Sequence, residues 1–147
     1  MEKGFYCINK PKGLTSFDII AKIRKMSGVK KVGHAGTLDP LASGVLVVAV
    51  GKENTRKINK IMSEEKEYIA HIKLGEFSET DDQEGKKTEV IVEKEPDLLD
   101  IKKILSEFTG KISQVPPKYS AIKINGKRAY KMARENKNFN LKQGMFL

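Results

Sequence analysis

Residues 33–44 read Gly33-His-Ala-Gly-Thr-Leu-Asp-Pro-Leu-Ala-Ser-Gly44, and the apolar run Val-Leu-Val-Val-Ala-Val follows directly at residues 45–50. That run is typical of a buried strand. The three glycines allow tight turns or positive φ in the loop before it, and Pro40 fixes φ directly after Asp39. The pattern predicts a loop that presents Asp39 as a nucleophile or general base would be presented. The alternative is that Asp39 only makes an Asx-type turn before Pro40.

Upstream of this loop the sequence predicts one strand and one helix. Residues 5–8 form an apolar strand, residues 10–13 form a turn, and Ser16 is the expected N-cap of a helix that Gly28 ends. The apolar helix positions 17, 20, 23 and 26 are expected to face the core. Cys7, the single cysteine, lies in the strand and is expected to be a buried structural residue.

Downstream of the loop the pattern alternates between helices and strands, which predicts the α+β class. A helix is expected at about residues 54–62, an alternating strand at 68–74, a turn at 78–85 and a strand at about 88–92. Asp100 is the expected cap of a helix that Gly110 stops. A strand at 119–124, a tight Asn125-Gly126 turn and a short helix at about 128–135 complete the chain.

Charge is distributed unevenly along the 147 residues, whose formal net charge is +9. Residues 76–100 hold ten of the 19 acids, whereas residues 111–147 hold nine Lys or Arg and one acid, Glu135. A basic region of this kind favours a polyanionic partner, although a solvated charged surface is the alternative. Tyr119 and Tyr130 are expected either to stack on a base or to pack in the core. The candidate phosphate-binding residues are Lys123, Lys127, Arg128, Lys131 and Arg134.

Several kinds of site are disfavoured by the sequence. There is no Cys/His cluster for zinc and no phosphate-binding loop of the Gly-x-x-x-x-Gly-Lys-Ser/Thr kind. Residues 80–85 superficially resemble a calcium loop but lack the full ligand register and its closing glutamate. We therefore expect no metal site and no nucleotide triphosphate chemistry. No apolar run is long enough to span a membrane, and the first residues lack the apolar core of a signal peptide, so we expect a cytoplasmic protein with no membrane partner. We also expect a monomer.

Four ordered blocks of sequence resemble the TruB-type family of tRNA pseudouridine(55) synthases. The blocks are Lys10-Pro-Lys-Gly-Leu-Thr-Ser-Phe-Asp18; the loop at 33–44 with its continuation to Gly51; Lys66-Glu-Tyr68 with Leu74-Gly75 and Thr80-Asp-Asp-Gln-Glu-Gly85; and Val115-Pro-Pro-Lys-Tyr-Ser-Ala-Ile-Lys123 with Asn125-Gly-Lys-Arg-Ala-Tyr130. The resemblance implies the pseudouridine synthase fold, a mixed and largely antiparallel sheet with flanking helices. It also implies a cofactor-free isomerisation of uridine to pseudouridine at position 55, in the T-loop of tRNA, on a flipped base.

The resemblance implies roles for individual residues. Asp39 matches the catalytic aspartate of the family, which attacks the sugar or abstracts a proton from it. His34 matches a position near the flipped nucleotide, and Tyr68 matches the active-site tyrosine that stacks on the uracil. Lys10 and Pro11 match the first motif of the family, which packs against the catalytic loop, so we expect them to be architectural.

The resemblance also implies that part of the family architecture is missing. Family members run on for roughly as many residues again, so we read residues 1–147 as the N-terminal part of a single catalytic domain. The sheet would then be incomplete at its C-terminus, and the C-terminal RNA-binding domain of the family would be absent. We expect this chain to be less stable than a full enzyme and to have little or no turnover. The alternative function is a non-catalytic RNA-binding module. A protein-interaction domain is the third and least favoured function.

Overall fold

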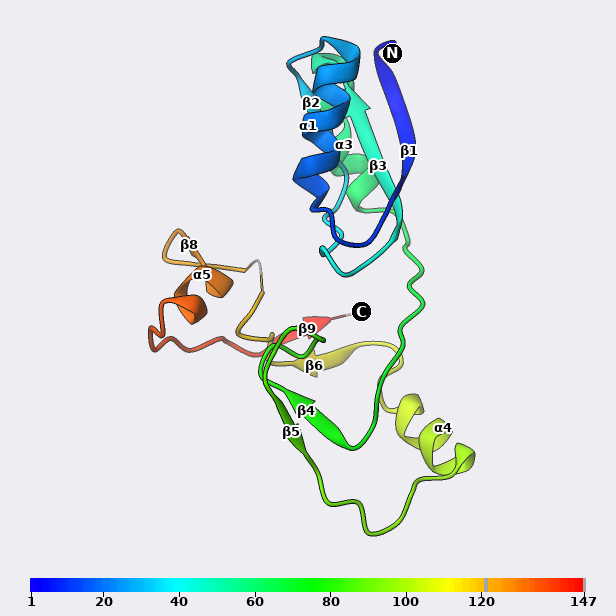
Figure 1. The fold of residues 1–147 in the computed structure, drawn as a ribbon, viewed down its shortest axis with the longest axis vertical. Helices are drawn as coiled ribbons and strands as arrows, with labels where there is room; N and C mark the ends of the chain where they lie inside the picture. Colours follow the sequence, from blue (N-terminus) through cyan, green and yellow to red (C-terminus); the bar gives the residue numbers. More distant parts are fainter. Residues whose placement is uncertain (121, 147) are drawn as a thin grey trace. The chain divides into compact units, whose positions relative to one another are not determined.

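The computed structural model of the chain describes residues 1–120 and 122–146. The chain divides into two compact units, Met1–Ile69 and Ala70–Leu147, which are called here the N-terminal and C-terminal units (Figure 1). Every strand pairing in the described residues is antiparallel, and helices accompany the strands in both units. The α+β expectation is therefore confirmed.

A three-stranded antiparallel sheet forms the framework of the N-terminal unit. Its strands are β1 (Gly4–Lys10), β2 (Val32–His34) and β3 (Gly44–Val50), in the order β1-β3-β2. Val48 of β3 pairs with Tyr6 on one side and with His34 on the other. Because β3 is the central strand, the apolar run at residues 45–50 lies mostly inside, as its sequence predicts.

Helix α1 (Ser16–Ser27) packs against this sheet. Its N-cap is Thr15, so the prediction of Ser16 was wrong by one residue. The Thr15 hydroxyl accepts a hydrogen bond from Asp18 N, and the Asp18 carboxylate accepts one from Thr15 N at 2.8 Å, which makes a capping box. Gly28 ends the helix in the left-handed conformation at φ 68°, as predicted.

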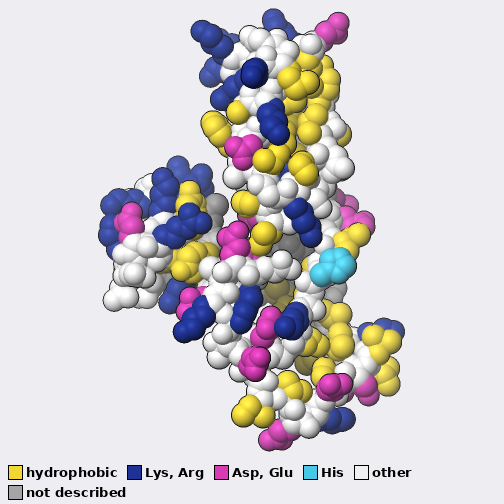
Figure 2. Space-filling model, in the orientation of Figure 1, with side chains coloured by type: hydrophobic (Ala, Val, Ile, Leu, Met, Phe, Trp, Pro, Cys, Tyr) yellow, Lys and Arg dark blue, Asp and Glu magenta, His cyan; other side chains and the backbone are white. Residues whose placement is uncertain are grey.

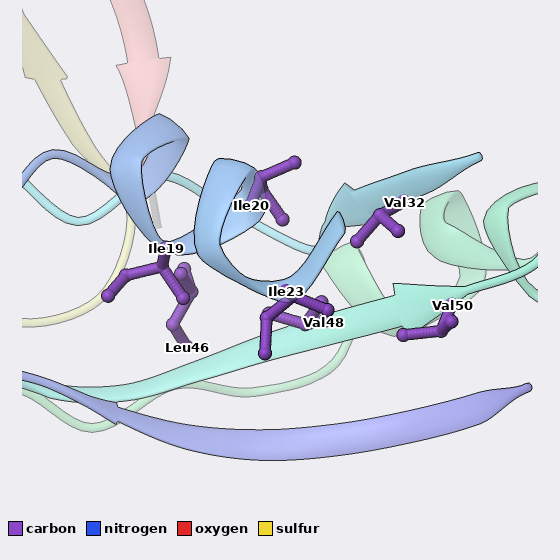
Figure 3. Close-up of a cluster of buried hydrophobic side chains, with 7 residues drawn as sticks. All are labelled: Ile19, Ile20, Ile23, Val32, Leu46, Val48 and Val50. Atoms are coloured by element: carbon purple, nitrogen blue, oxygen red, sulfur yellow. The ribbon is translucent and has the colours of Figure 1, made fainter. Parts of the chain in front are cut away.

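The core of the N-terminal unit lies between α1 and the sheet (Figure 3). Its buried hydrophobic residues are Ile19, Ile20, Ile23, Val32, Leu46, Val48 and Val50. Phe17 and Met26 are 64% and 72% exposed, so the predicted inward face of α1 was only partly right. The buried face is centred on positions 19, 20 and 23, which adjoin one another at the helical period. Cys7 is exposed, because alternation along β1 turns its side chain outward, and the expectation of a buried cysteine was wrong.

After β3 the predicted helix at residues 54–62 is split into α2 (Lys52–Thr55) and α3 (Ile58–Met62). The strand predicted at residues 68–74 is absent, because residues 65–73 have no regular secondary structure. The alternating pattern there is real, but a strand forms only when another strand takes up its backbone hydrogen bonds. None of the described segments pairs with residues 65–73.

The C-terminal unit consists of short elements. Strands β4 (Glu76–Ser78) and β5 (Lys87–Glu89) form a hairpin around the predicted turn, and β5 is shorter than the strand predicted at residues 88–92. Helix α4 (Leu98–Ser106) is capped by Asp97 and not, as predicted, by Asp100, which is the other half of a second capping box. Strands β6 (Ile112–Gln114) and β9 (Gly144–Phe146) pair with each other.

The last third of the chain contains one further hairpin and one helix. Strands β7 (Lys123–Ile124) and β8 (Lys127–Arg128) flank Asn125 and Gly126, whose φ angles of 49° and 81° make the predicted tight turn. The structure confirms only residues 123–124 of the strand predicted at 119–124, and Ala121 lies outside the described residues. Helix α5 (Ala129–Arg134) lies within the predicted helix at 128–135.

Candidate active site

The loop that carries Asp39 connects β2 to the central strand β3. The backbone on both sides of Asp39 is held by hydrogen bonds. Leu38 N donates to Ser16 Oγ at 2.9 Å, and Ser16 Oγ donates to Leu38 O at 3.0 Å. On the other side of the acid, Gly13 N donates to Pro40 O at 2.8 Å, and Ala42 N donates to the carbonyl of Asp39 itself at 3.0 Å. The Asp39 backbone is therefore fixed, although its loop has no regular secondary structure.

The turn at residues 11–14, which supplies one of these bonds, is organised by a buried lysine. Lys10 is 0% exposed, and its Nζ donates to Pro11 O at 3.0 Å and to Leu14 O at 2.8 Å. The ammonium group thus binds two backbone carbonyls of the turn whose Gly13 N–H reaches the Asp39 loop. This geometry agrees with the architectural role expected for Lys10 and Pro11.

The Asp39 side chain is exposed, while the backbone around it is held in place. The N-terminal unit places no salt bridge and no side-chain hydrogen bond on its carboxylate among the described residues. An exposed carboxylate on a fixed backbone is free to react with a molecule that docks against the loop. An Asx turn would use the carboxylate as an internal acceptor, and no such bond is formed here.

His34 is the last residue of β2 and is half-buried. Its Nδ1 lies 2.6 Å from the carbonyl oxygen of Gly36. A carbonyl can only accept, so Nδ1 carries the proton in this contact and Nε2 is the ring nitrogen left for other partners. Gly36 adopts φ 98°, a backbone conformation that favours glycine at this position of the loop. His34 and Asp39 therefore belong to one locally ordered loop.

Tyr68 lies in the segment without regular structure and is 70% exposed. No hydrogen bond of its hydroxyl is formed with the described residues of the N-terminal unit. Ile72 and Leu74, which share the alternating pattern with Tyr68, are 75% and 58% exposed, so both side chains face solvent. The structure orders His34 and Asp39 but leaves Tyr68 outside that ordered loop.

The five predicted phosphate-binding residues all lie in the C-terminal unit and are exposed. They are Lys123 in β7, Lys127 and Arg128 in β8, and Lys131 and Arg134 in α5. Figure 2 shows Lys and Arg side chains gathered over the part of the molecule that carries β8 and α5. Three of the five, Lys127, Arg128 and Lys131, line a shallow hollow of about 340 Å³, together with Gly126, Met132, Glu135 and Lys137.

Two further contacts shape this basic surface. Lys137 Nζ donates to the Glu135 carboxylate, and this contact, with smaller contributions from Lys127 and Lys131, lowers the pKa of Glu135. The single acid of the region therefore stays ionised beside the lysines. The Arg134 guanidinium lies over the Tyr130 ring, 5.8 Å from its centroid. Tyr130 is half-buried, which fits packing of its ring rather than an open stacking surface.

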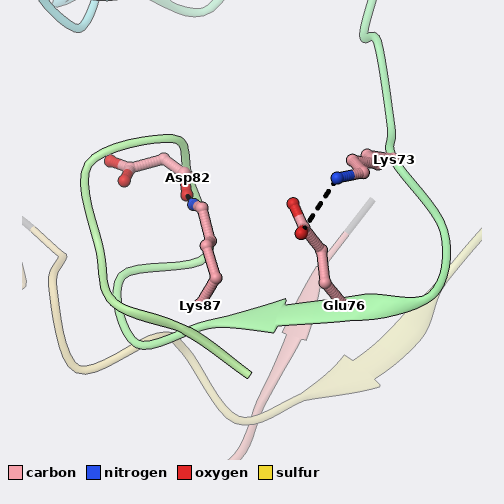
Figure 4. A network of polar contacts seen from close by, with 4 residues as sticks. All are labelled: Lys73, Glu76, Asp82 and Lys87. Atoms are coloured by element: carbon pink, nitrogen blue, oxygen red, sulfur yellow. Dashed lines mark hydrogen bonds and ion pairs between the residues drawn. The ribbon is translucent and has the colours of Figure 1, made fainter. Parts of the chain in front are cut away.

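The acidic loop at residues 79–86 is a closed turn. Asp82 accepts hydrogen bonds from the Thr80 hydroxyl and from Glu84 N, and Lys87 Nζ donates to the Asp82 carbonyl. The Thr80 hydroxyl is the main reason why the pKa of Asp82 is lowered. Figure 4 shows this loop and the ion pair of Lys73 Nζ with Glu76 Oε2 at 3.0 Å. In the part of the chain that the structure describes, no cluster of His, Cys, Asp or Glu is suited to hold a metal.

Comparison with known proteins decides the family. Residues 24–145 match the family described as "TruB family pseudouridylate synthase (N terminal domain)". The chain belongs to this family. The matched range includes the loop with His34 and Asp39, Tyr68 and all five basic residues. The family that the sequence resemblance indicated is therefore confirmed.

Relatives named tRNA pseudouridine synthase B align with nearly the whole chain. The protein from Clostridium novyi is 47% identical over 92% of this chain and 46% of its own length. The protein from Protochlamydia amoebophila is 47% identical over 90% of this chain and 50% of its own length. The chain thus spans about half the length of these TruB relatives.

A solved structure of similar fold supports the pseudouridine synthase architecture. A chain of "Crystal Structure of a Cbf5-Nop10-Gar1 Complex" is 29% identical and gives a TM-score of 0.54. The alignment covers 82% of this chain and 31% of the solved one. The mixed helices and antiparallel strands of this TruB-family chain are therefore those of the expected fold class. No helix in the described residues has the length and apolar character needed to cross a bilayer.

Sequence reasoning missed one polar contact of the site. Ser16 is 3% exposed, and its hydroxyl holds both backbone groups of Leu38, a residue 22 positions away. The only sequence signal was the Thr15-Ser16 pair with Asp18 three residues after Thr15. That spacing identifies Thr15 as the cap, which leaves the hydroxyl of Ser16 available for another partner.

Proposed function

We propose that this chain carries the catalytic loop of a tRNA pseudouridine synthase that isomerises uridine in the T-loop, at position 55. The observation that carries the proposal is the exposed Asp39 carboxylate on a loop whose backbone is hydrogen-bonded at residues 38, 39 and 40. Membership of the TruB family and relatives named tRNA pseudouridine synthase B support the reaction and the substrate.

The reaction breaks the bond between uracil N1 and sugar C1′, rotates the base and forms a bond between C5 and C1′. The proton on C5 is lost and N1 gains one, so no oxidant, reductant or cofactor is consumed. Asp39 serves either by attacking the sugar or by abstracting a proton from it. The target base must leave its stack to reach the carboxylate.

His34 and Tyr68 are the proposed substrate contacts. The Nδ1 bond to Gly36 fixes the imidazole of His34 and leaves Nε2 for the extruded nucleotide or the RNA backbone. Tyr68 has an exposed ring, which is available to stack on uracil when substrate is bound. Tyr68 lies in a segment without regular secondary structure, so strand pairing does not fix the direction of its ring.

The basic surface around β8 and α5 is the proposed contact with the tRNA backbone. The cations that we propose for this contact are Lys123, Lys127, Arg128, Lys131 and Arg134, all of them exposed. Cations at these positions neutralise phosphates and release counterions, which makes affinity depend on salt. A cytoplasmic monomer without a metal remains the prediction.

The test is tritium release from a T-arm RNA labelled at C5 of its target uridine, with the chain in excess over RNA. Although we expect little or no turnover, the excess of chain requires only one round of reaction for the readout. Any release by the unaltered chain should be absent with Asp39→Ala. Asp39→Asn should also abolish release while RNA affinity stays nearly unchanged, because the proposed role of the carboxylate is chemical. Release that survives Asp39→Ala would contradict the assignment of the catalytic residue.

The second candidate is a non-catalytic RNA-binding module, which the concentration of nine cations in residues 111–147 favours. For such a module, Asp39 substitutions would have no effect on any RNA readout. Lys127→Ala combined with Lys131→Ala should then weaken binding and reduce the salt slope by about one for each phosphate that is no longer neutralised. Lys102→Ala on α4 is the matched control for a lysine removed elsewhere in the same unit. RNA binding without tritium release would favour this second function.

A further inference from the structure

We propose that Ser16 is a positioning residue for Asp39, acting through the backbone of Leu38. The proposal has a structural part, the restraint of the loop, and a functional part that rests on the proposed role of Asp39. Ser16 is the first residue of α1, and its hydroxyl both donates to Leu38 O and accepts from Leu38 N, at 3.0 and 2.9 Å. Leu38 directly precedes Asp39 in the chain.

The hydroxyl of Ser16 satisfies the two backbone groups of Leu38 that a neighbouring strand would otherwise satisfy. A residue in a sheet has its N–H and C=O satisfied by a neighbouring backbone, but Leu38 has no regular secondary structure. A serine hydroxyl carries one donor and two acceptor sites, so it can satisfy both groups at once. Ser16 is 3% exposed, and water is therefore poorly placed to replace its hydroxyl.

The hydroxyl of Ser16 is available because its neighbour performs the capping. Thr15 Oγ1 accepts from Asp18 N at 3.1 Å and donates to the Asp18 carboxylate, so the cap of α1 is complete without Ser16. The two adjacent hydroxyls thus have separate roles. The hydroxyl of Thr15 stabilises the helix, and that of Ser16 connects the helix to the loop.

The connection is rigid on the helix side as well as on the loop side. Helix α1 places Ile19, Ile20 and Ile23 in the core, and the Leu38 side chain packs against the same cluster. Leu38 is therefore held by its backbone and by its side chain. Since Pro40 has a fixed φ and its carbonyl accepts from Gly13 N, little freedom remains for the Asp39 backbone. Holding a reacting group in one geometry raises the rate of the step it performs.

The experiment compares Ser16→Ala with Thr15→Ala by amide hydrogen exchange, measured by NMR on the full 147-residue chain. The reference amide is that of Val48 in the central strand, which reports opening of the whole core. We expect Ser16→Ala to speed exchange at Leu38 by about tenfold or more relative to Val48, as loss of a buried hydrogen bond predicts. Thr15→Ala should change both amides by the same factor.

Equal acceleration of Leu38 and Val48 in Ser16→Ala would overturn the proposal, because it would show that Ser16 only stabilises the fold. The tritium-release assay then gives the functional readout. Where the unaltered chain releases tritium, Ser16→Ala should lower the single-turnover rate constant by about tenfold, with T-arm affinity within about twofold. An unaltered rate constant beside faster Leu38 exchange would overturn the positioning role. Absence of release from the unaltered chain would count against the proposed function, while the exchange result would still decide whether Ser16 holds the loop.

Discussion

The two units of the chain differ in what their apolar residues do. In the N-terminal unit, one helix and a three-stranded sheet enclose seven buried hydrophobic residues. In the C-terminal unit, Pro116 and Ala129 are the buried residues among those whose burial is described. Helix α4 is as well capped as α1, yet Leu98, Leu99, Ile104 and Leu105 on it are all more than half exposed. Local signals are therefore sufficient to start a helix, but burial requires a complementary surface.

The same difference separates the candidate catalytic residue from the candidate RNA contacts. Asp39 lies in the N-terminal unit, which has a hydrophobic core. Hydrogen bonds to α1 and to the turn at residues 11–14 fix its loop. The basic residues lie on a hairpin of two-residue strands and on a six-residue helix. The backbone of the Asp39 loop is thus fixed within the N-terminal unit, whereas the basic surface depends on short elements with little packing beneath them.

The largest expected effect comes from truncating matched leucines in the two units. Leu46 is 1% exposed and Leu105 is 54% exposed. Leu46→Ala should lower the free energy of unfolding by about 2–5 kcal/mol, because it removes buried contacts and leaves a cavity. Leu105→Ala should change it by less than about 0.5 kcal/mol, as surface substitutions do. Urea denaturation followed by circular dichroism measures both, and equal losses would contradict the contrast between the units.

A smaller effect is expected from removing the two helix caps. Thr15→Ala should lower the free energy of unfolding of the N-terminal unit by about 1 kcal/mol, because α1 is part of its core. Asp97→Ala removes the corresponding cap of α4. Since α4 buries no residue, that variant should lose helix content without moving the unfolding midpoint of the N-terminal unit. A midpoint lowered equally by both variants would show that α4 folds together with that unit.

The smallest expected effect is on the pH dependence of the stability of the N-terminal unit. Hydrogen bonds from the Thr15 hydroxyl, and then from Thr15 N, lower the pKa of Asp18. A carboxyl whose pKa is lowered by folding stabilises the fold above its unfolded pKa of about 3.9, and that contribution is lost as pH falls through the folded pKa. Asp18→Asn should therefore be less stable at neutral pH and should lose less further stability below about pH 4.

The control for this titration is Asp82→Asn in the β4–β5 loop. The pKa of Asp82 is also lowered, chiefly by the Thr80 hydroxyl, but Asp82 lies outside the N-terminal core. Its substitution should leave the pH dependence of the N-terminal unit unchanged. Thermal melts at several pH values measure both variants, and an Asp18→Asn profile parallel to that of the unaltered chain would contradict the assignment.

The parts of the fold that could be predicted are those with a strong local signal. The apolar run that became β3, Gly28 at the end of α1 and the Asn125-Gly126 turn each have a direct physical cause in the residues themselves. The N-caps of α1 and α4 were both predicted at the wrong residue. Ser16 is the hydroxyl residue directly after the true cap, Thr15, and Asp100 is the other half of the capping box that begins at Asp97. The strand predicted at 68–74 failed because pairing depends on a partner that its own sequence does not specify.

The candidate site divides in the same way. The loop with His34 and Asp39 was evident from its glycines and from the buried strand after it. The hydroxyl of Ser16 was missed, because its bond to Leu38 joins residues 22 positions apart and nothing in the intervening sequence encodes it. The position of Tyr68 was inferred from a strand that did not form. Contacts within one turn can thus be predicted from the sequence, whereas contacts between residues that only the packing of the fold brings together cannot.

The most direct test of the account is residue-resolved hydrogen exchange over the whole chain at neutral pH. The central claim is that the N-terminal unit is a folded platform for Asp39, whereas the C-terminal unit lacks a comparable core among its described residues. The account predicts strong protection in α1 and β3 and at Leu38, with α4 and the β4–β5 hairpin exchanging far faster. Protection of α4 equal to that of α1, or an unprotected Leu38 amide, would contradict it.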